Sequence, residues 1–111
     1  MRKKEVTLEL AEQALKDIIS PDEKKVITPE YIISVVAEHY GVTPADLSGN
    51  KRNSKIVMPR QVSMYLCREI ISTPLKNIGK ALGNRDHTTV MHGIEKIENE
   101  LQTDDNLKKY H

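Results

Sequence analysis

The sequence predicts an all-α fold, and three observations support this prediction. Apolar residues recur at the three- and four-residue spacing of amphipathic helices along most of the 111 residues. Threonine, proline and glycine stand where these patterns begin and end, as they do at helix termini. No segment alternates apolar and polar residues over the length of a β-strand. We therefore expect one domain of short helices with a modest core, preceded by a further helix.

The N-terminal helix is predicted over residues 5–19. Its apolar positions follow helical spacing and are Val6, Leu8, Leu10, Ala11, Ala14, Leu15, Ile18 and Ile19. The run Ser20-Pro21-Asp22 ends this helix, and a polar connector follows it. We therefore place a boundary near residue 26, with residues 1–26 as a linker and residues 27–111 as the domain.

The first helix of the domain has a complete start signal. Thr28 suits the N-cap, Pro29 suits the first helical position, and Glu30 complements the positive end of the helix dipole. Tyr31, Ile32, Val35, Val36 and Tyr40 form its apolar stripe. Gly41 is predicted to end this helix.

The next helix starts in the same way. Pro44 follows Thr43, and Asp46 stands three residues after Thr43, as in a capping box. The run 48–50, Ser-Gly-Asn, limits this helix to about one turn.

A longer helix is predicted to begin at Pro59, after a basic loop over residues 51–57, and to end at the Ser-Thr-Pro run 72–74. Its expected inner side is marked by Val62, Tyr65, Leu66, Glu69 and Ile70. The single cysteine, Cys67, is expected to be a small buried core residue.

Residues 78–93 read IGKALGNRDHTTVMHG and carry the most specific pattern. A short helical pattern breaks at Gly83-Asn84, and a second one runs through Val90, Ile94, Ile97 and Leu101. Two short helices around a tight glycine-containing turn are typical of a helix-turn-helix, whose second helix enters the major groove of DNA. The tail after residue 103 is polar, although Leu107 and Tyr110 could pack as a last helix.

The second of these helices opens with Asp86, His87, Thr88 and Thr89. Asp86 is expected to cap the helix in any case. Capping alone does not account for a histidine and two threonines, which are not strong helix formers. On a recognition helix the threonines offer a methyl or hydroxyl group, His87 can donate to guanine or thymine, and Asp86 can accept from cytosine. We therefore predict base readout from this turn.

The other histidines carry weaker signals. His92 lies one turn beyond Thr88, where a base or phosphate contact and a plain exposed position are both reasonable. Because His87 and His92 are five residues apart and no cysteine joins them, we predict no metal site. His39 is expected to be packed or exposed without a functional role.

The charges are unevenly distributed. Residues 50–92 hold eight basic and two acidic residues, a net charge of +6, whereas the rest of the chain carries −5. A basic middle between acidic ends is typical of a polyanion-binding face. With four tyrosines as the only aromatic residues, a stacking platform for single strands is not favoured.

The basic loop offers a second contact with DNA. A flexible arginine beside a helix-turn-helix can enter the minor groove, and Arg52 is our candidate. Lys51 and Lys55 are expected to meet phosphates, and Arg60 and Gln61 can grip a phosphate at the start of the following helix. The alternative is an ordinary charged surface loop.

Other function classes find little support in the sequence. It contains no P-loop, no nucleophile-elbow motif and no zinc-protease motif, so we expect neither an enzyme nor a bound cofactor. No apolar run is long enough to span a bilayer. A docking arm for proteins or lipids is a competing interpretation of residues 5–19, but their four acids against one lysine disfavour anionic lipid.

The motifs RDHTTV, MPRQ and TPEYIISVVAEHYGV, within residues 27–101, make the chain resemble the C-terminal DNA-binding domain of the DnaA family of bacterial replication initiators. The resemblance implies a Trp-repressor-like helix-turn-helix that binds DnaA boxes, TTATNCACA-like sites in double-stranded DNA, at the replication origin. It implies major-groove contacts from Asp86, His87 and Thr88, with Thr89 and His92 nearby, and minor-groove insertion of Arg52. It implies contacts with the DNA backbone from Arg60, Gln61, Lys76 and Arg85.

The resemblance also implies a larger protein. Residues 1–26 would be the end of the lid helix of an AAA+ ATPase module, and the partners would be DNA, the rest of that chain and regulatory proteins. ATP binding in the family needs a P-loop, which is missing here. Asn53-Ser54 after Arg52 replace the denser arginine run of many family loops, so phosphate contacts are fewer. We expect a cytoplasmic, nucleoid-associated protein that binds an asymmetric site as a monomer.

Overall fold

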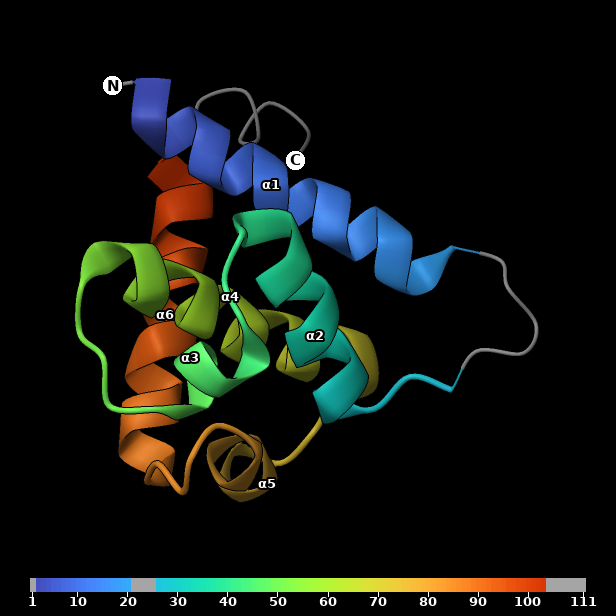
Figure 1. The fold of residues 1–111 in the computed structure, drawn as a ribbon, viewed down its shortest axis with the longest axis vertical. Coiled ribbons are helices and arrows are strands. Elements are labelled where there is room, and N and C mark those ends of the chain that lie inside the picture. Colours follow the sequence, from blue (N-terminus) through green and yellow to red (C-terminus); the bar gives the residue numbers. More distant parts are fainter. Residues whose placement is uncertain (1, 21–25, 104–111) are drawn as a thin grey trace.

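In a computed structural model, the described residues 2–20 and 26–103 form six α-helices and no strand (Figure 1). The helices are α1 (Arg2–Ile19), α2 (Pro29–Tyr40), α3 (Pro44–Ser48), α4 (Ser54–Ile71), α5 (Leu75–Ala81) and α6 (His87–Thr103). The all-α prediction is confirmed. The last helix considered for Leu107 and Tyr110 lies outside the described residues.

Helix α4 is the centre of the fold, because it contacts every other helix. Helices α2 and α6 make its largest contacts, and α5 packs against α6. The core between them contains Ile32 and Val36 of α2, Leu47 of α3, Val62 and Leu66 of α4, Ile78 of α5, Leu82, and Val90 and Ile97 of α6. Figure 1 shows α5 and the start of α6 at the end of the molecule opposite α1. The two helices of the predicted helix-turn-helix therefore lie together at one end.

The helix termini of α2 and α3 form as the sequence predicts. The Thr28 hydroxyl accepts a hydrogen bond from the Tyr31 N–H at 3.0 Å, and α2 ends at Gly41 with a φ of 72°. Both bonds of the capping box between Thr43 and Asp46 are present. These local hydrogen bonds hold α3 as a single short turn beside α4.

Helix α4 begins at Ser54, five residues before the start predicted at Pro59. The Asn53 carbonyl accepts hydrogen bonds from the N–H groups of Ile56 and Val57, which closes a first turn ahead of the proline. Ile56 and Pro59 are both buried, and this packing offsets the hydrogen bond that an internal proline removes. The basic loop therefore ends at Asn53, and Lys55 lies in the first turn of α4.

The interior of α4 also differs from the prediction at one position. Glu69, expected on the inner side, is exposed, because α4 reaches the surface near its C-terminus. Val62, Leu66 and Cys67 are buried as expected.

Helix α1 packs on α2 through Ala14 and Ile18, which are fully buried. A ring nitrogen of His39 on α2 lies 2.8 Å from a carboxylate oxygen of Asp17 on α1. Ala14 and Ile18 of α1 are thus used within the fold, which weakens the interpretation of this helix as a free docking arm. No helix in the described part of the chain is long and apolar enough to cross a membrane.

Candidate nucleic-acid interface

The turn between α5 and α6 is tight and depends on two glycines. Gly83 has a φ of 88°, and Asn84 follows it with a φ of 63°. The carbonyl of Gly79 on α5 accepts a hydrogen bond from the Arg85 N–H at 2.9 Å. A Cβ at Gly79 would collide with the Arg85 carbonyl. The turn is therefore pressed directly onto α5, as the predicted helix-turn-helix requires.

Asp86 caps α6. Its Oδ1 accepts a hydrogen bond from the Thr88 N–H at 2.9 Å, and its backbone carbonyl accepts one from Val90 at 3.2 Å. The capping role predicted for Asp86 is confirmed. The cap uses only Oδ1 of Asp86. Its Oδ2 has no hydrogen-bond partner among the described residues.

The first turn and a half of α6 faces solvent on its outer side. The exposed residues there are Asp86, His87, Thr88, Thr89, Met91 and His92, whereas Val90 is buried. His92 follows Thr88 by four residues, which places both side chains on the same side of the helix. The structure thus brings all five residues predicted for major-groove contact onto one exposed helix end.

The basic loop lies on one flank of this surface. Arg52 and Lys55 are exposed, and Lys51 is held at 3.0 Å from Asp46 by an ion pair. That hydrogen bond and the one from the Thr43 N–H hold the pKa of the Asp46 carboxyl below its usual value. The ion pair and the capping box therefore attach the loop to α3.

Arg60 is placed differently from its expected position at the DNA backbone. Arg60 is only 6% exposed, and its guanidinium points toward the backbone of α3 and of the segment that follows it. Nε donates to the Leu47 carbonyl at 2.8 Å, and Nη2 donates to the carbonyls of Lys51 at 2.9 Å and Gly49 at 3.3 Å. Burial, followed by the nearby charge of Arg85, lowers the pKa of Arg60. Because the donors of Arg60 are bonded to these carbonyls, this arrangement does not favour a contact between Arg60 and a DNA phosphate. That contact stays a prediction.

Arg85 is also directed inward. Its Nη2 donates to the Gly49 carbonyl at 2.6 Å, and its Nη1 donates to the Leu82 carbonyl. Burial lowers its pKa. Arg60 and Arg85 therefore shape the loop between α3 and α4 from two sides.

Gln61 packs against α6 where this helix approaches α4. A Cβ at Gly93 would lie 3.2 Å from Cγ of Gln61 and would also crowd the Met64 sulfur. The Oε1 of Gln61 is buried and has no hydrogen-bond partner among the described residues. The half-buried Gln61 thus lies beside Gly93 of α6.

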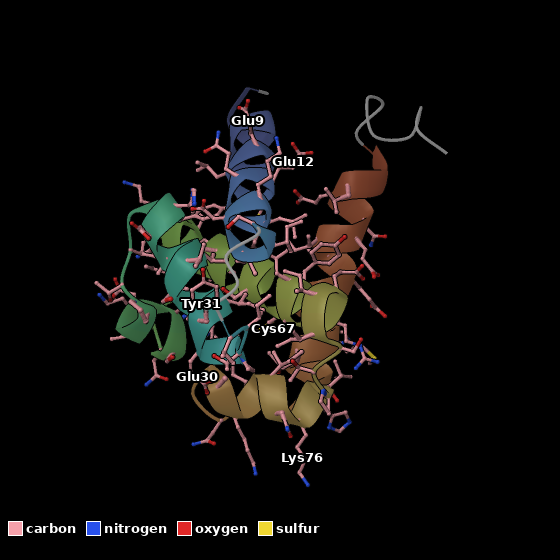
Figure 2. The ribbon with its side chains drawn as sticks, turned by 90° about the vertical axis from the view of Figure 1, so that its right-hand side faces the viewer. Glu9, Glu12, Glu30, Tyr31, Cys67 and Lys76 are labelled. Atoms are coloured by element: carbon pink, nitrogen blue, oxygen red, sulfur yellow. The ribbon has the colours of Figure 1, made fainter. Side chains whose placement is uncertain are left out.

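A hollow borders the opposite flank of α6, between the end of α4, the start of α5 and His87. Its basic lining residues are Arg68, Lys76, Lys80 and Arg85, and its one acid is the capping Asp86. Figure 2 shows Lys76 extending outward from α5, at the end of the molecule opposite Glu9 and Glu12 on α1. This basic hollow extends the charged surface to the other side of the exposed first turn of α6.

Arg68, like Lys80, is a basic residue of the hollow to which the sequence analysis assigned no role. It is exposed, and its Nη1 donates to the Thr73 carbonyl at 3.1 Å. Its charge is visible in the sequence, but its nearness to His87 depends on how the C-terminal end of α4 meets α5. No local pattern in the sequence signals that meeting.

The remaining candidates lie away from this surface. His39 contacts Asp17 at the α1 end, as described above. Cys67 is buried, and this burial raises the pKa of its thiol to about 12. A search of the described residues finds no group of three or more histidine, cysteine or acidic side chains arranged to hold a metal ion.

Comparisons with known proteins agree with this geometry. A family model described as the bacterial DnaA protein helix-turn-helix matches residues 29–97, from the start of α2 into α6. The chain is 49% identical over 104 residues to the chromosomal replication initiator protein DnaA of Lachnoclostridium phytofermentans, covering 94% of this chain and 23% of that protein. It is 46% identical over 108 residues to the protein of the same name from Latilactobacillus sakei, covering 97% and 24%. The chain thus spans about a quarter of the length of these relatives.

Proposed function

The chain belongs to the bacterial DnaA helix-turn-helix family, and we propose that it binds double-stranded DNA sequence-specifically at DnaA boxes of a replication origin. In this proposal the N-terminal part of α6 lies in the major groove and Arg52 reaches the adjacent minor groove. The observation that carries the proposal is the exposed turn of α6, which has basic groups on both flanks.

The flanking charges fit the dimensions of DNA. An α-helix with its side chains is about 10–12 Å across, which matches a major groove about 12 Å wide. When a helix fills the groove, the two phosphate backbones run along its two sides. Lys51 and Lys55 would then meet one backbone, and Arg68, Lys76 and Lys80 the other. A simple charged surface would not need this two-sided arrangement.

The exposed turn of α6 supplies the chemistry for base readout. Thr88 and Thr89 present methyl and hydroxyl groups, and His87 presents a ring donor. The free Oδ2 of Asp86 can accept a hydrogen bond from the amino group of cytosine while Oδ1 caps the helix. His92 extends the same side by one turn. Together these residues would distinguish base pairs by their major-groove edges.

In this proposal Arg52 reads the second groove. It is an exposed residue of the basic loop, and no hydrogen bond to its side chain is found among the described residues. The narrow minor groove of A·T-rich DNA has an enhanced negative potential, which attracts arginine. Arg52 would therefore read shape and A·T content beside the bases read by α6.

The larger protein enters the proposal through the relatives. Because the chain spans about a quarter of their length, we infer that it acts with the rest of a DnaA chain, including an ATPase module, in replication initiation. Residues 1–26 would form the link to that module. Regulatory proteins that compete for the same surface are further candidate partners.

Inosine substitution tests the two-groove arrangement. An I·C pair has the major-groove edge of G·C but a minor groove like that of A·T, because it lacks the guanine amino group. We expect I·C replacing A·T under α6 to weaken binding about 5- to 100-fold, since a wrong base pair costs about 1–3 kcal/mol. I·C replacing A·T at the base pairs whose minor groove Arg52 is proposed to enter should change the affinity little. Equal affinity for the box, its I·C variants and a shuffled duplex would contradict the proposed function.

A further inference from the structure

Met91 is an exposed apolar side chain on α6, the helix proposed to read bases. The exposed large hydrophobic residues among those described are Ile19, Val26 and Met91, and Met91 is 39% exposed. The other large apolar residues of α6 pack inward, with Val90, Ile94 and Ile97 all buried. Met91 is therefore left out of the core, although methionine is an apolar residue that readily fills gaps in cores.

The position of Met91 places it next to the residues proposed to read bases. It follows His87 by four residues and Thr88 by three, so the three side chains share one side of α6. His87 also lines the basic hollow together with Lys76. Met91 thus lies close both to the side chains proposed to read bases and to the side of α6 that borders the basic hollow, where one phosphate backbone is proposed to run.

The charges on α6 limit how far DNA can extend along the helix. Glu95 follows Met91 by one turn, Glu98 by two, and both are exposed. These acids repel phosphates, so the DNA-facing part of α6 ends near His92. Within that part, residues 86–92, Met91 is the one exposed side chain without a polar group.

We propose that Met91 is a specificity-determining residue that packs against the 5-methyl group of a thymine in the bound site. The thymine methyl is the distinctive apolar group on the base edges of the major groove. The thioether chain of methionine is long and flexible enough to follow it. The inference rests on the proposed binding of DnaA boxes and adds an apolar contact to those proposed for Thr88 and Thr89.

A methyl-deletion scan tests this contact. Each thymine of a box duplex is replaced in turn by deoxyuridine, which removes only the methyl group, and affinities are measured by fluorescence anisotropy. Removing one buried methyl should weaken binding of the unmodified protein about three- to fivefold at the contacted thymine. Met91→Ala should lower affinity for the unmodified box and show no further loss at that thymine. Met91→Leu should retain most of the sensitivity.

Two controls separate the possible results. Asn99→Ala changes an exposed residue beyond the acids of α6 and should keep the full deoxyuridine profile. Thr88→Ser removes another methyl and should alter the profile at a different thymine. The inference is overturned if Met91→Ala and the unmodified protein have the same profile at every position, or if no thymine methyl affects binding. Loss of box preference in the unmodified protein would instead overturn the proposed function.

Discussion

Arg60 and Arg85 donate hydrogen bonds to the same backbone carbonyl, that of Gly49, with Nη2···O distances of 3.3 Å and 2.6 Å. Arg60 belongs to α4, and Arg85 lies in the turn that leads into α6. The segment between α3 and α4, which contains the basic loop, is therefore bonded at Gly49 both to the central helix and to the helix-turn-helix. These two hydrogen bonds set the position of Arg52 relative to the exposed first turn of α6. The two proposed DNA contacts are therefore fixed relative to each other.

Arg60 is expected to matter mainly for stability. Arg60→Ala removes charged donors from the carbonyls of Leu47, Lys51 and Gly49, and we expect it to lower the free energy of unfolding by about 2–3 kcal/mol. Arg60→Lys should recover only part of this loss, because one ammonium cannot reproduce the planar guanidinium contacts. Urea denaturation measures both effects. An unchanged midpoint in Arg60→Ala would show that these contacts do not stabilise the loop.

Gly79 provides a test of the close approach between α5 and the turn. We expect Gly79→Ala to destabilise the fold by about 1–3 kcal/mol, because the new Cβ meets the Arg85 carbonyl, which belongs to the backbone. Gly41→Ala is the matched control, since it strains a positive φ of 72° but has open space around its Cβ. Both variants are compared by thermal unfolding. If Gly79→Ala retains box binding and full stability, the tight packing of this turn is not required.

Asp86 allows capping and base readout to be separated. Asp86→Asn should keep the stability of the domain, because asparagine caps helices as well as aspartate does. It should still change the preference at the base pair that Asp86 reads, since the free side-chain atom becomes a donor. Asp86→Ala should lose about 1 kcal/mol of stability as well. The two properties are measured by denaturation and by binding to single-substitution duplexes. Unaltered base preference in Asp86→Asn would leave this residue with the capping role alone.

Asp46 makes stability depend on acidic pH. The pKa of its carboxyl lies below the usual range of an aspartate in the folded protein, first because of the hydrogen bond from Lys51 and then because of that from the Thr43 N–H. A carboxyl whose folded pKa is lowered stabilises the fold fully above its unfolded pKa, and this stabilisation is lost as pH falls through the folded pKa. The stability difference between the native chain and Asp46→Asn should therefore be present at pH 6 and shrink below about pH 4. Urea midpoints at several pH values measure it, and a pH-independent difference would contradict the assignment.

Local chemistry made much of the fold predictable from sequence. Thr28, Gly41 and the Thr43–Asp46 capping box act through residues three or four positions apart, so their pattern in the sequence was sufficient to place helix ends. The start of α4 could not be placed in this way. Proline normally marks a helix start, and the first turn before Pro59 is retained by the burial of Ile56 in a core that is assembled from distant segments.

The candidate site divides in the same manner. The exposed turn of α6 follows from helical periodicity, because Val90 and Ile94 must face inward and their neighbours must not. The roles of Arg60 and Arg85 do not follow from sequence, since both donate to carbonyls of residues at least nine positions away along the chain, in the segment from α3 to the basic loop. The sequence indicated two surface cations, whereas in the fold their guanidinium groups donate hydrogen bonds to backbone carbonyls. Arg68 shows the reverse case, because its place beside His87 depends on the crossing of α4 and α5.

The central claim is sequence-specific binding of a DnaA box, and fluorescence anisotropy across a salt series tests it most directly. We expect an affinity for the box about 10³-fold or more above that for a base-shuffled duplex. Five basic groups facing phosphates should give a slope of log K against log salt of about −4.5 on the box. His87→Ala should reduce the ratio between the two duplexes, whereas Lys76→Ala should weaken both together. Equal, strongly salt-dependent binding to both duplexes would contradict the account and leave only a basic surface.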